Sequence, residues 1–319
     1  MIEPTAPDQN LPAKRVLSLG AGVQSTTLLL LVARGALPPI DAAIFSDTGW
    51  EPAVVYAHLD KIDAQIAQPA GIPILRVSSG NIRDDALDPT HRFASMPMYV
   101  LNKDGSPGMT RRQCTSEYKI KPIKVAVRSL LGYPHPTPVP KGVFAEQWVG
   151  ISTDEAHRMH ESDVNYSVNR YPLIELGMSR ADCIRYLTEL GWGETPKSAC
   201  VGCPFHGNAA WRNLRDNAPA DFADAVAFDD AIRNGSAKAN FEGKSLRGEM
   251  YLHRSRVPLS EAPIDRVTRH EWNARQGDLL ADLDDPLVFE QMYEEDDLPG
   301  CSPFACRADG IVLDDGEAV

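Results

Sequence analysis

Three short segments of this 319-residue chain contain residues that suit chemistry on a phosphorylated ligand. The first is VLSLGAGVQSTTLLLL (16–31), in which a glycine turn separates two apolar runs. Glycines let the backbone approach phosphate, and the start of a helix adds amide donors and about half a positive charge. A tight turn without a ligand is the alternative interpretation. The predicted contacts are Ser18, Gly20, Ala21, Gly22, Gln24, Ser25 and Thr26.

The second segment is SDTGWEP (46–52), which follows another short apolar run. In a nucleotide-binding protein, an acidic residue at the end of this strand holds ribose hydroxyls or a metal ion. We therefore add Asp47, Thr48 and Gly49 to the predicted nucleotide contacts. Helix capping by Asp47 or Thr48 ahead of Pro52 explains the same residues equally well.

The third segment, RRQCTSEYKIKP (111–122), groups cationic side chains around a cysteine. We predict that Arg111, Arg112 and Lys119 clamp an anionic group and stabilise the charge that develops during catalysis. A pair of adjacent arginines on a solvated loop is the alternative.

Cysteines form a further candidate site in SACVGCPFH (198–206). The thiols of Cys200 and Cys203 have the spacing that grips one metal ion or one edge of an iron–sulfur cluster. Two packed thiols are the alternative. Cys183 falls in a predicted helix, where a core position competes with a role as ligand. Cys301 and Cys306 lie in the tail.

The elements that must position these residues alternate between strand and helix. This βαβαβ order predicts a parallel sheet with helices on its faces and ligands beyond the carboxyl ends of its strands. The expected elements are strand 16–20, helix 24–33, strand 42–46, helix 53–66 and strand 72–77.

The rest of the chain reads less regularly. Residues 78–112 are expected to be irregular, and the proline-rich stretch 132–142 cannot be helical. Ser179 and Asp182 have the spacing of a capping box. Residues 278–297 form an acidic flank. Further elements are expected at helix 118–131, strand 147–151, helix 179–190 and helix 217–233.

Composition places the chain in a broad class. A hydrophobic share of 43% and a charged share of 24% are ordinary for a soluble globular protein. The net charge of -12 disfavours non-specific nucleic-acid binding. The sequence contains neither a membrane-spanning apolar run nor a secretory signal, so we expect a cytoplasmic protein that does not contact membranes. Six cysteines in such a chain favour metal or catalytic roles over disulfides.

Together these segments resemble the PP-loop (adenine nucleotide alpha-hydrolase-like) superfamily, and within it the phosphoadenosine phosphosulfate (PAPS) reductase family. The likeness runs from Val16 to His206 and includes CTSEYKIKPIKVAVR (114–128), WVGISTDEAHRM (148–159) and YPLIE (171–175), the last at the place of a family strand. It implies an α/β, Rossmann-like parallel twisted sheet with helices on both faces. The implied organisation is a tail (1–14), a nucleotide-binding domain (15–205) and a mostly helical C-terminal extension (206–319).

The resemblance also implies cofactors and a ligand set. The nucleotide is ATP or PAPS, and a [4Fe-4S] cluster, with zinc as the alternative, is held by cysteines. Cluster-bearing relatives carry a cysteine pair at the position of Cys114 and Thr115, so Cys114 joins Cys200 and Cys203 as a ligand. The fourth ligand is Cys183, Cys301, Cys306 or His206, of which we take Cys183.

Two departures from the family bear on the reaction. Val23 stands where ATP-cleaving members carry the phosphate-binding lysine, and the family's tail Glu-Cys-Gly-Leu-His nucleophile motif is absent. We expect a PAPS reductase-like enzyme for sulfur transfer or ATP alpha-phosphate chemistry, working with a thiol reductant or sulfur donor. The alternatives are a non-catalytic nucleotide-binding accessory of a mobile-element defence or type IV CRISPR system, an ATP-dependent nucleic-acid thiolation enzyme, and a dinucleotide oxidoreductase. Such phage, plasmid and defence relatives make a nucleic-acid or defence-complex partner conceivable, and the sequence does not indicate an oligomeric state.

Overall fold

Five parallel strands form the central sheet of the computed structural model, which describes residues 11–92, 95–243, 248–267 and 272. The strand order is β3-β2-β1-β6-β7, so the chain leaves β1 in one direction and later returns to its other side. Ligands of such sheets bind where the order reverses, which here is between β1 and β6. The strands are β1 (Lys14–Ser18), β2 (Ala42–Asp47), β3 (Ile74–Ser78), β6 (Ala145–Val149) and β7 (Ser167–Arg170).

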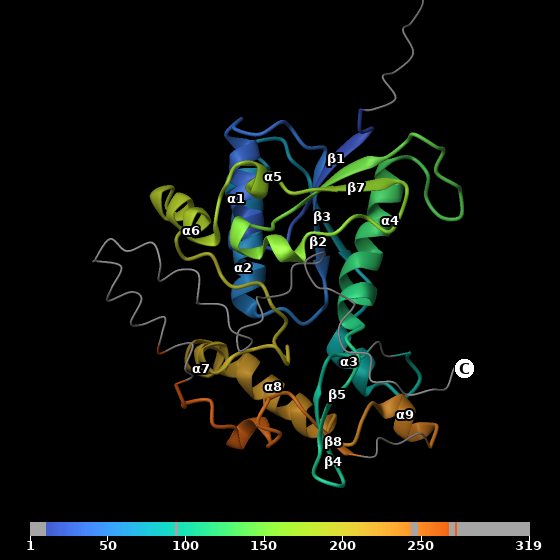
Figure 1. The fold of residues 1–319 in the computed structure, drawn as a ribbon, viewed down its shortest axis with the longest axis vertical. Helices are drawn as coiled ribbons and strands as arrows, with labels where there is room; N and C mark the ends of the chain where they lie inside the picture. Colours follow the sequence, from blue (N-terminus) through green and yellow to red (C-terminus); the bar gives the residue numbers. More distant parts are fainter. Residues whose placement is uncertain (1–10, 93–94, 244–247, 268–271, 273–319) are drawn as a thin grey trace, which may run out of the picture.

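Helices cover both faces of this sheet (Figure 1). The central strands are apolar on both sides because each face is buried: Leu17 joins the core under α1, α2 and α6, whereas Val16 joins the core under α4. The predicted α/β, Rossmann-like sheet is thereby confirmed. The flanking helices are α1 (Val23–Ala33), α2 (Ala53–Ile62), α4 (Lys121–Leu130), α5 (Pro172–Glu175) and α6 (Arg180–Glu189).

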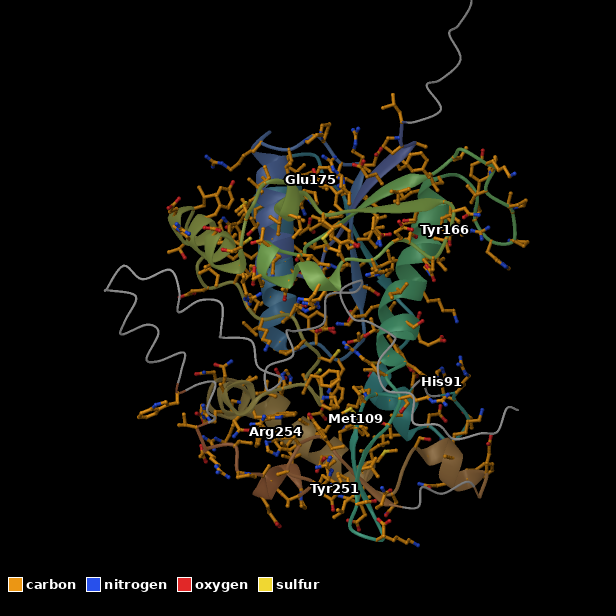
Figure 2. The ribbon with its side chains drawn as sticks, viewed as in Figure 1. His91, Met109, Tyr166, Glu175, Tyr251 and Arg254 are labelled. Atoms are coloured by element: carbon orange, nitrogen blue, oxygen red, sulfur yellow. The ribbon has the colours of Figure 1, made fainter. Side chains whose placement is uncertain are left out.

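A second group of elements lies beyond one end of the sheet. Its antiparallel sheet has the order β5-β4-β8, and Figure 2 shows Met109 and Tyr251 in this lower part, with Tyr166 and Glu175 in the upper part. Trp50 and Met98 share its core with Phe228, so residues on both sides of position 205 pack together. The elements are α3 (Ile82–Leu87), β4 (Tyr99–Asn102), β5 (Pro107–Met109), α7 (Asn208–Asn217), α8 (Pro219–Ala231), α9 (Ala237–Phe241), β8 (Gly248–Tyr251) and a 3-10 turn, η4 (Leu259–Glu261).

Several elements differ from the sequence-based expectations. The segment 78–112 is not irregular throughout, since it contains α3, β4 and β5; β4 pairs with β8, whose distance along the chain hides the pairing from local pattern. The YPLIE segment is helix α5, not a strand, because Pro172 suits the first turn of a helix; the strand β7 ends just before it. Helix α7 was not expected. Single π-helical turns extend α2 and precede α4, at η1 (Asp63–Ala67) and η2 (Thr115–Ile120).

Other local predictions are confirmed. Ser179 accepts a hydrogen bond from the Asp182 amide, and the Asp182 carboxylate accepts one from the Ser179 amide, which completes the capping box of α6. Residues 132–142 contain no helix. None of the described helices is long and apolar enough to cross a membrane. The tail residues 1–10, the acidic flank 278–297, Cys301 and Cys306 lie outside the described residues.

Candidate functional site

The glycine turn predicted to bind phosphate joins β1 to α1 at the reversal point of the sheet. The amides of Gly20 and Gly22 both donate to Ser25 Oγ, at 3.2 and 3.3 Å. Ala21 has a φ of +55°, a left-handed conformation that is uncommon outside glycine. Successive amides that converge in this way form a concavity suited to an anion, and the first amides of α1 have no partner within the helix. The loop therefore has the geometry of an anion-binding turn.

Two other segments approach this turn so closely that a side chain at Gly22 or Gly150 would be tightly packed. A Cβ on Gly22 would lie 3.2 Å from Ser198 Cβ, and a Cβ on Gly150 would lie 3.1 Å from the Ser25 amide nitrogen. Gly150 follows β6, so the loops after β1 and β6 are in contact. Ser198 belongs to the segment that carries Cys200 and Cys203, which brings the cysteine motif to the same edge of the sheet.

A buried polar network fixes the start of α1; we call Gln24, Ser152, Glu155, Arg158 and Arg180 the switch-point network. Gln24 Nε2 donates to Glu155 Oε2 at 3.1 Å, and Arg180 Nη1 donates to Gln24 Oε1 at 2.8 Å. Arg158 Nη1 donates to Glu155 Oε1 at 2.6 Å. Glu155 and Arg158 are only 4% and 8% exposed. Both oxygens of this buried carboxylate are thus paired.

Arg180 supplies positive charge at the start of α1. Its guanidinium binds the second residue of the helix, Gln24, while its backbone amide donates to Asp154 at 2.8 Å. The neighbouring Val23 is the position at which ATP-cleaving PP-loop proteins are expected to carry lysine. A cation from α6 therefore lies next to the position where the sequence lacks one.

The loop after β2 is also held in one conformation. Asp47 Oδ1 accepts hydrogen bonds from the Gly49 amide and from the Tyr56 hydroxyl, both at 2.7 Å. Burial and the Asp47 carboxylate raise the pKa of Tyr56, so its hydroxyl stays a donor. Gly49 has a φ of +73°, and a Cβ there would lie 2.8 Å from Asn81 Cα. These contacts fix Asp47 and the following Thr48 at the carboxyl end of β2.

Four buried polar side chains meet beside this loop; we call Thr48, Glu51, Lys119 and Cys200 the Cys200 cluster. Glu51 Oε1 accepts from Thr48 Oγ1 at 3.0 Å and from Cys200 Sγ at 3.5 Å, and it lies 3.7 Å from Lys119 Nζ. Thr48 Oγ1 and Cys200 Sγ are 3.2 Å apart. The four residues are 1%, 5%, 5% and 9% exposed. Glu51 Oε2, also buried, has no hydrogen-bond partner.

The cysteine motif forms a tight turn that packs on Trp50. The Cys203 amide donates to the Cys200 carbonyl at 3.1 Å, and the Val201 amide donates to the Trp50 carbonyl at 2.8 Å. A Cβ on Gly202 would lie 2.0 Å from the Trp50 ring. His206 Nε2 also hydrogen-bonds the Cys200 carbonyl, at 2.9 Å. The turn thus holds both cysteines in a defined place over the loop that follows β2.

The three predicted cationic residues occupy different environments. Lys119 lies in the Cys200 cluster, paired with Glu51. The guanidinium of Arg112 stacks 4.9 Å from the ring centroid of Phe205, just beyond the cysteine turn. Arg111 is exposed. The structure therefore brings Lys119 and Arg112 to the cysteine segment, whereas Arg180 contacts Gln24 at the glycine turn.

The cysteines predicted to bind a metal have different surroundings. The Cys200 thiol contacts the hydroxyl of Thr48 and the carboxylate of Glu51. Cys114 packs against the hydrophobic core that contains Trp50 and Phe228. Cys183 lies in the core under α6, where burial raises the pKa of its thiol to about 12. Across the described ranges, no three Cys, His, Asp or Glu side chains gather in a way that could hold a metal ion. The cluster or zinc site that the resemblance implies therefore stays a prediction, and we assign no step to it.

Sequence reasoning did not identify Glu51, Glu155, Arg158 or Arg180 as site residues. Glu51 lies within the quoted segment SDTGWEP, and Glu155 and Arg158 lie within STDEAHR, so the motifs pointed to the correct loops. Arg180 carried no signal beyond its place next to a helix cap.

Comparisons with known proteins do not assign the chain to a family. No known family model matches the chain, and no curated protein matches it. The resemblance to the PAPS reductase family therefore stays a proposal.

Proposed function

We propose that the chain binds an adenine nucleotide at the carboxyl edge of the sheet between β1 and β6, as a PAPS reductase-like PP-loop protein. One observation carries the proposal: the amides of Gly20 and Gly22 converge on a single oxygen atom at the start of α1, where the strand order reverses. A phosphate oxygen can take the place of the Ser25 hydroxyl as acceptor. Helix starts at such points are common phosphate sites in α/β proteins.

The cationic side chains near the glycine turn bear on which nucleotide binds there. Arg158 pairs with Glu155, and Arg180 contacts Gln24 in the first turn of α1. The absence of lysine at Val23 weakens the case for ATP cleavage and favours a sulfonucleotide such as PAPS. In that reaction a thiolate attacks the sulfonate sulfur and the nucleotide leaves, with a thiol reductant as co-substrate. In the ATP version, a substrate oxygen attacks the alpha-phosphate and pyrophosphate leaves.

Binding measurements with a glycine variant test the proposal. Gly22→Val places a branched side chain against Ser198 and removes the close approach to the loop. We expect ATP and PAPS to bind the variant more than about tenfold more weakly, which corresponds to about 1.4 kcal/mol, in isothermal titration. Gly108→Val on β5 is the matched control, because a Cβ there meets only ordinary contacts at 3.5 Å. Equal affinities for wild type and a folded Gly22→Val variant contradict the proposal.

Turnover assays separate an enzyme from a binding accessory. Release of sulfite from PAPS, or of pyrophosphate from ATP, supports catalysis. Nucleotide binding without any turnover supports the alternative of a non-catalytic accessory with a protein or nucleic-acid partner. Binding of NAD in place of ATP and PAPS overturns the proposal and favours a dinucleotide oxidoreductase.

A further inference from the structure

We infer that Cys200 and Cys203 form a redox-active dithiol, in which Cys203 reacts first with a disulfide substrate and Glu51 serves as the base for Cys200. This inference is independent of the proposed nucleotide binding, because it rests only on the cysteine turn and the side chains packed against it. The Cys200 thiol contacts a hydroxyl and a carboxylate, which are groups that suit proton transfer.

The turn brings the two cysteines within bonding range. They occupy the first and last positions of a four-residue turn closed by the 3.1 Å bond from the Cys203 amide to the Cys200 carbonyl. The end Cα atoms of such a turn lie less than about 7 Å apart, and disulfides join Cα atoms about 4.4–6.8 Å apart. Contacts of Val201 and Gly202 with Trp50 hold the turn in place.

Glu51 is placed as a base for the inner thiol. Cys200 Sγ donates to Glu51 Oε1 at 3.5 Å, and Thr48 and Lys119 hold the same oxygen atom. A nucleophile in reach of a base, with the base oriented by a third group, is the usual arrangement of an activated thiol or hydroxyl. Glu51 Oε2 is buried without a partner, and a buried carboxylate oxygen left in this state needs an explanation. Cys200 donates to the other oxygen, Oε1, so the proton is transferred there while Oε2 keeps an open acceptor site.

The exposure of the two thiols determines which of them attacks the external disulfide first. Cys203 is half-buried and can be reached by an external disulfide, whereas Cys200 is 9% exposed and lies against its base. The outer thiol therefore forms the mixed disulfide. The inner thiol, already beside Glu51, is placed to resolve it.

The proposed reaction consists of two successive thiol–disulfide exchange steps. The Cys203 thiolate attacks one sulfur of an external disulfide, so the Cys203–substrate bond forms and the first substrate thiolate leaves with a proton from solvent. Cys200 then gives its proton to Glu51 and attacks Cys203 Sγ. The second substrate thiolate leaves with the proton from Glu51. Two protein thiols are oxidised to one disulfide and one external disulfide is reduced to two thiols; an external dithiol reverses the sequence.

Thiol mapping on the full chain tests this inference. Reduced protein, purified without oxygen, is incubated with oxidised glutathione, alkylated, digested and analysed by mass spectrometry. We expect one intramolecular disulfide between Cys200 and Cys203. Cys183 is the internal control, because burial raises its thiol pKa to about 12 and it should stay reduced. The Cys200→Ser variant should accumulate glutathione on Cys203, since the resolving thiol is gone.

Glu51→Gln tests the base. It keeps the shape of the side chain but removes its ability to take a proton, so closure of the mixed disulfide should slow by about tenfold or more. Glu117→Gln is the matched control: this carboxylate lies on the same π turn as Lys119 but pairs with Lys121, and its loss should leave the rate unchanged. Because the readout is the rate of one chemical step in folded protein, an unstable variant is recognised separately by its circular dichroism.

Three results overturn the inference. The first is a chain that carries stoichiometric iron or zinc and whose Cys200 and Cys203 resist oxidation until a chelator removes the metal. The second is a disulfide that joins either cysteine to Cys301 or Cys306 instead. The third is a Glu51→Gln variant that closes the disulfide at the wild-type rate.

Discussion

Two buried carboxylates lie at the same edge of the sheet, yet their surroundings differ. In the switch-point network, Arg158 binds one oxygen of Glu155 and Gln24 binds the other. In the Cys200 cluster, three groups crowd around one oxygen of Glu51, and the other oxygen has no partner. We call the first network closed, because both carboxylate oxygens are paired, and the second open, because one carboxylate oxygen has no hydrogen-bond partner.

This difference assigns the two regions different tasks. A fully paired buried network rigidifies its surroundings, so the switch-point network fixes Gln24 and Arg180 next to the glycine turn between β1 and α1. A partly paired carboxylate beside a thiol is poorly suited to stabilising the fold and well suited to moving a proton. In our proposals, this edge of the sheet combines a rigid ligand-binding half with a reactive half, and the two meet where Ser198 packs on Gly22.

Breaking the closed network should give the largest effect. Arg158→Met removes the partner of a carboxylate that is 4% exposed, which leaves a buried charge partly uncompensated. We expect the free energy of unfolding to fall by about 3–5 kcal/mol in urea denaturation. The matched control is Arg185→Ala, which removes an exposed pair with Asp182 at the same i,i+3 spacing and should cost about 0–1 kcal/mol. A loss for Arg158→Met no larger than that of the control contradicts the closed-network description.

Displacing the cysteine turn should have a smaller effect on stability but a sharper one on thiol chemistry. Gly202→Ala puts a methyl group 2.0 Å from the Trp50 ring, so the turn must move away from its support. Overpacking of this kind costs about 1–3 kcal/mol. We expect the Cys200–Cys203 disulfide to form more slowly while nucleotide affinity changes little. Gly108→Ala is the control; a variant with normal stability and normal thiol exchange would show that the Trp50 contact is unimportant.

Mild acid should cause a still smaller loss of stability, through a histidine that contacts α1, the helix that carries Gln24. His58 Nε2 lies 3.3 Å from Thr26 Oγ1, and burial lowers the pKa of His58 to about 4. The unfolded chain binds the proton near pH 6.5, so stability is lost as the pH falls from 6.5 towards 4. Between pH 7.5 and 5.5, His58→Leu should lose about 1–2 kcal/mol less than the wild type in urea denaturation.

The control for this pH effect is His135→Gln, which changes an exposed histidine and should keep the wild-type pH dependence. His253 has its pKa lowered to about 4 by burial as well, so the His58→Leu variant should retain part of the acid sensitivity. Identical pH profiles for wild type and His58→Leu would mean that His58 titrates normally in the folded chain.

The sequence predicted those parts of the fold that depend on neighbouring residues. The run from Val16 to Leu31 shows strand, turn and helix within sixteen residues, and Ser179 and Asp182 form their capping box three residues apart. Both features are local, so pattern and turn chemistry are sufficient to predict them. The parallel sheet followed from the alternation of such segments.

The remaining features depend on contacts between distant residues. Gln24 meets Glu155 across 131 residues, and Cys200 meets Glu51 across 149. Local sequence spacing cannot predict a contact between residues so far apart. The contacts of Glu51 and Arg180 were therefore found only in the three-dimensional structure. Strand β4 was missed for the same reason, because its partner β8 follows far along the chain. The predicted ligand Cys183 lies on the buried face of α6, and the sequence pattern of such a face is the same for a ligand and for a core thiol.

Hydrogen–deuterium exchange of the full chain with and without ATP or PAPS tests the central proposal most directly. We predict that saturating nucleotide slows amide exchange in residues 20–26 and 150–155, at the carboxyl ends of β1 and β6. Unchanged exchange there contradicts the proposal, above all if protection appears at the cavity of about 600 Å³ lined by Leu101, Asn102, Lys103, Asn234, Asn240, Gly248 and Glu249.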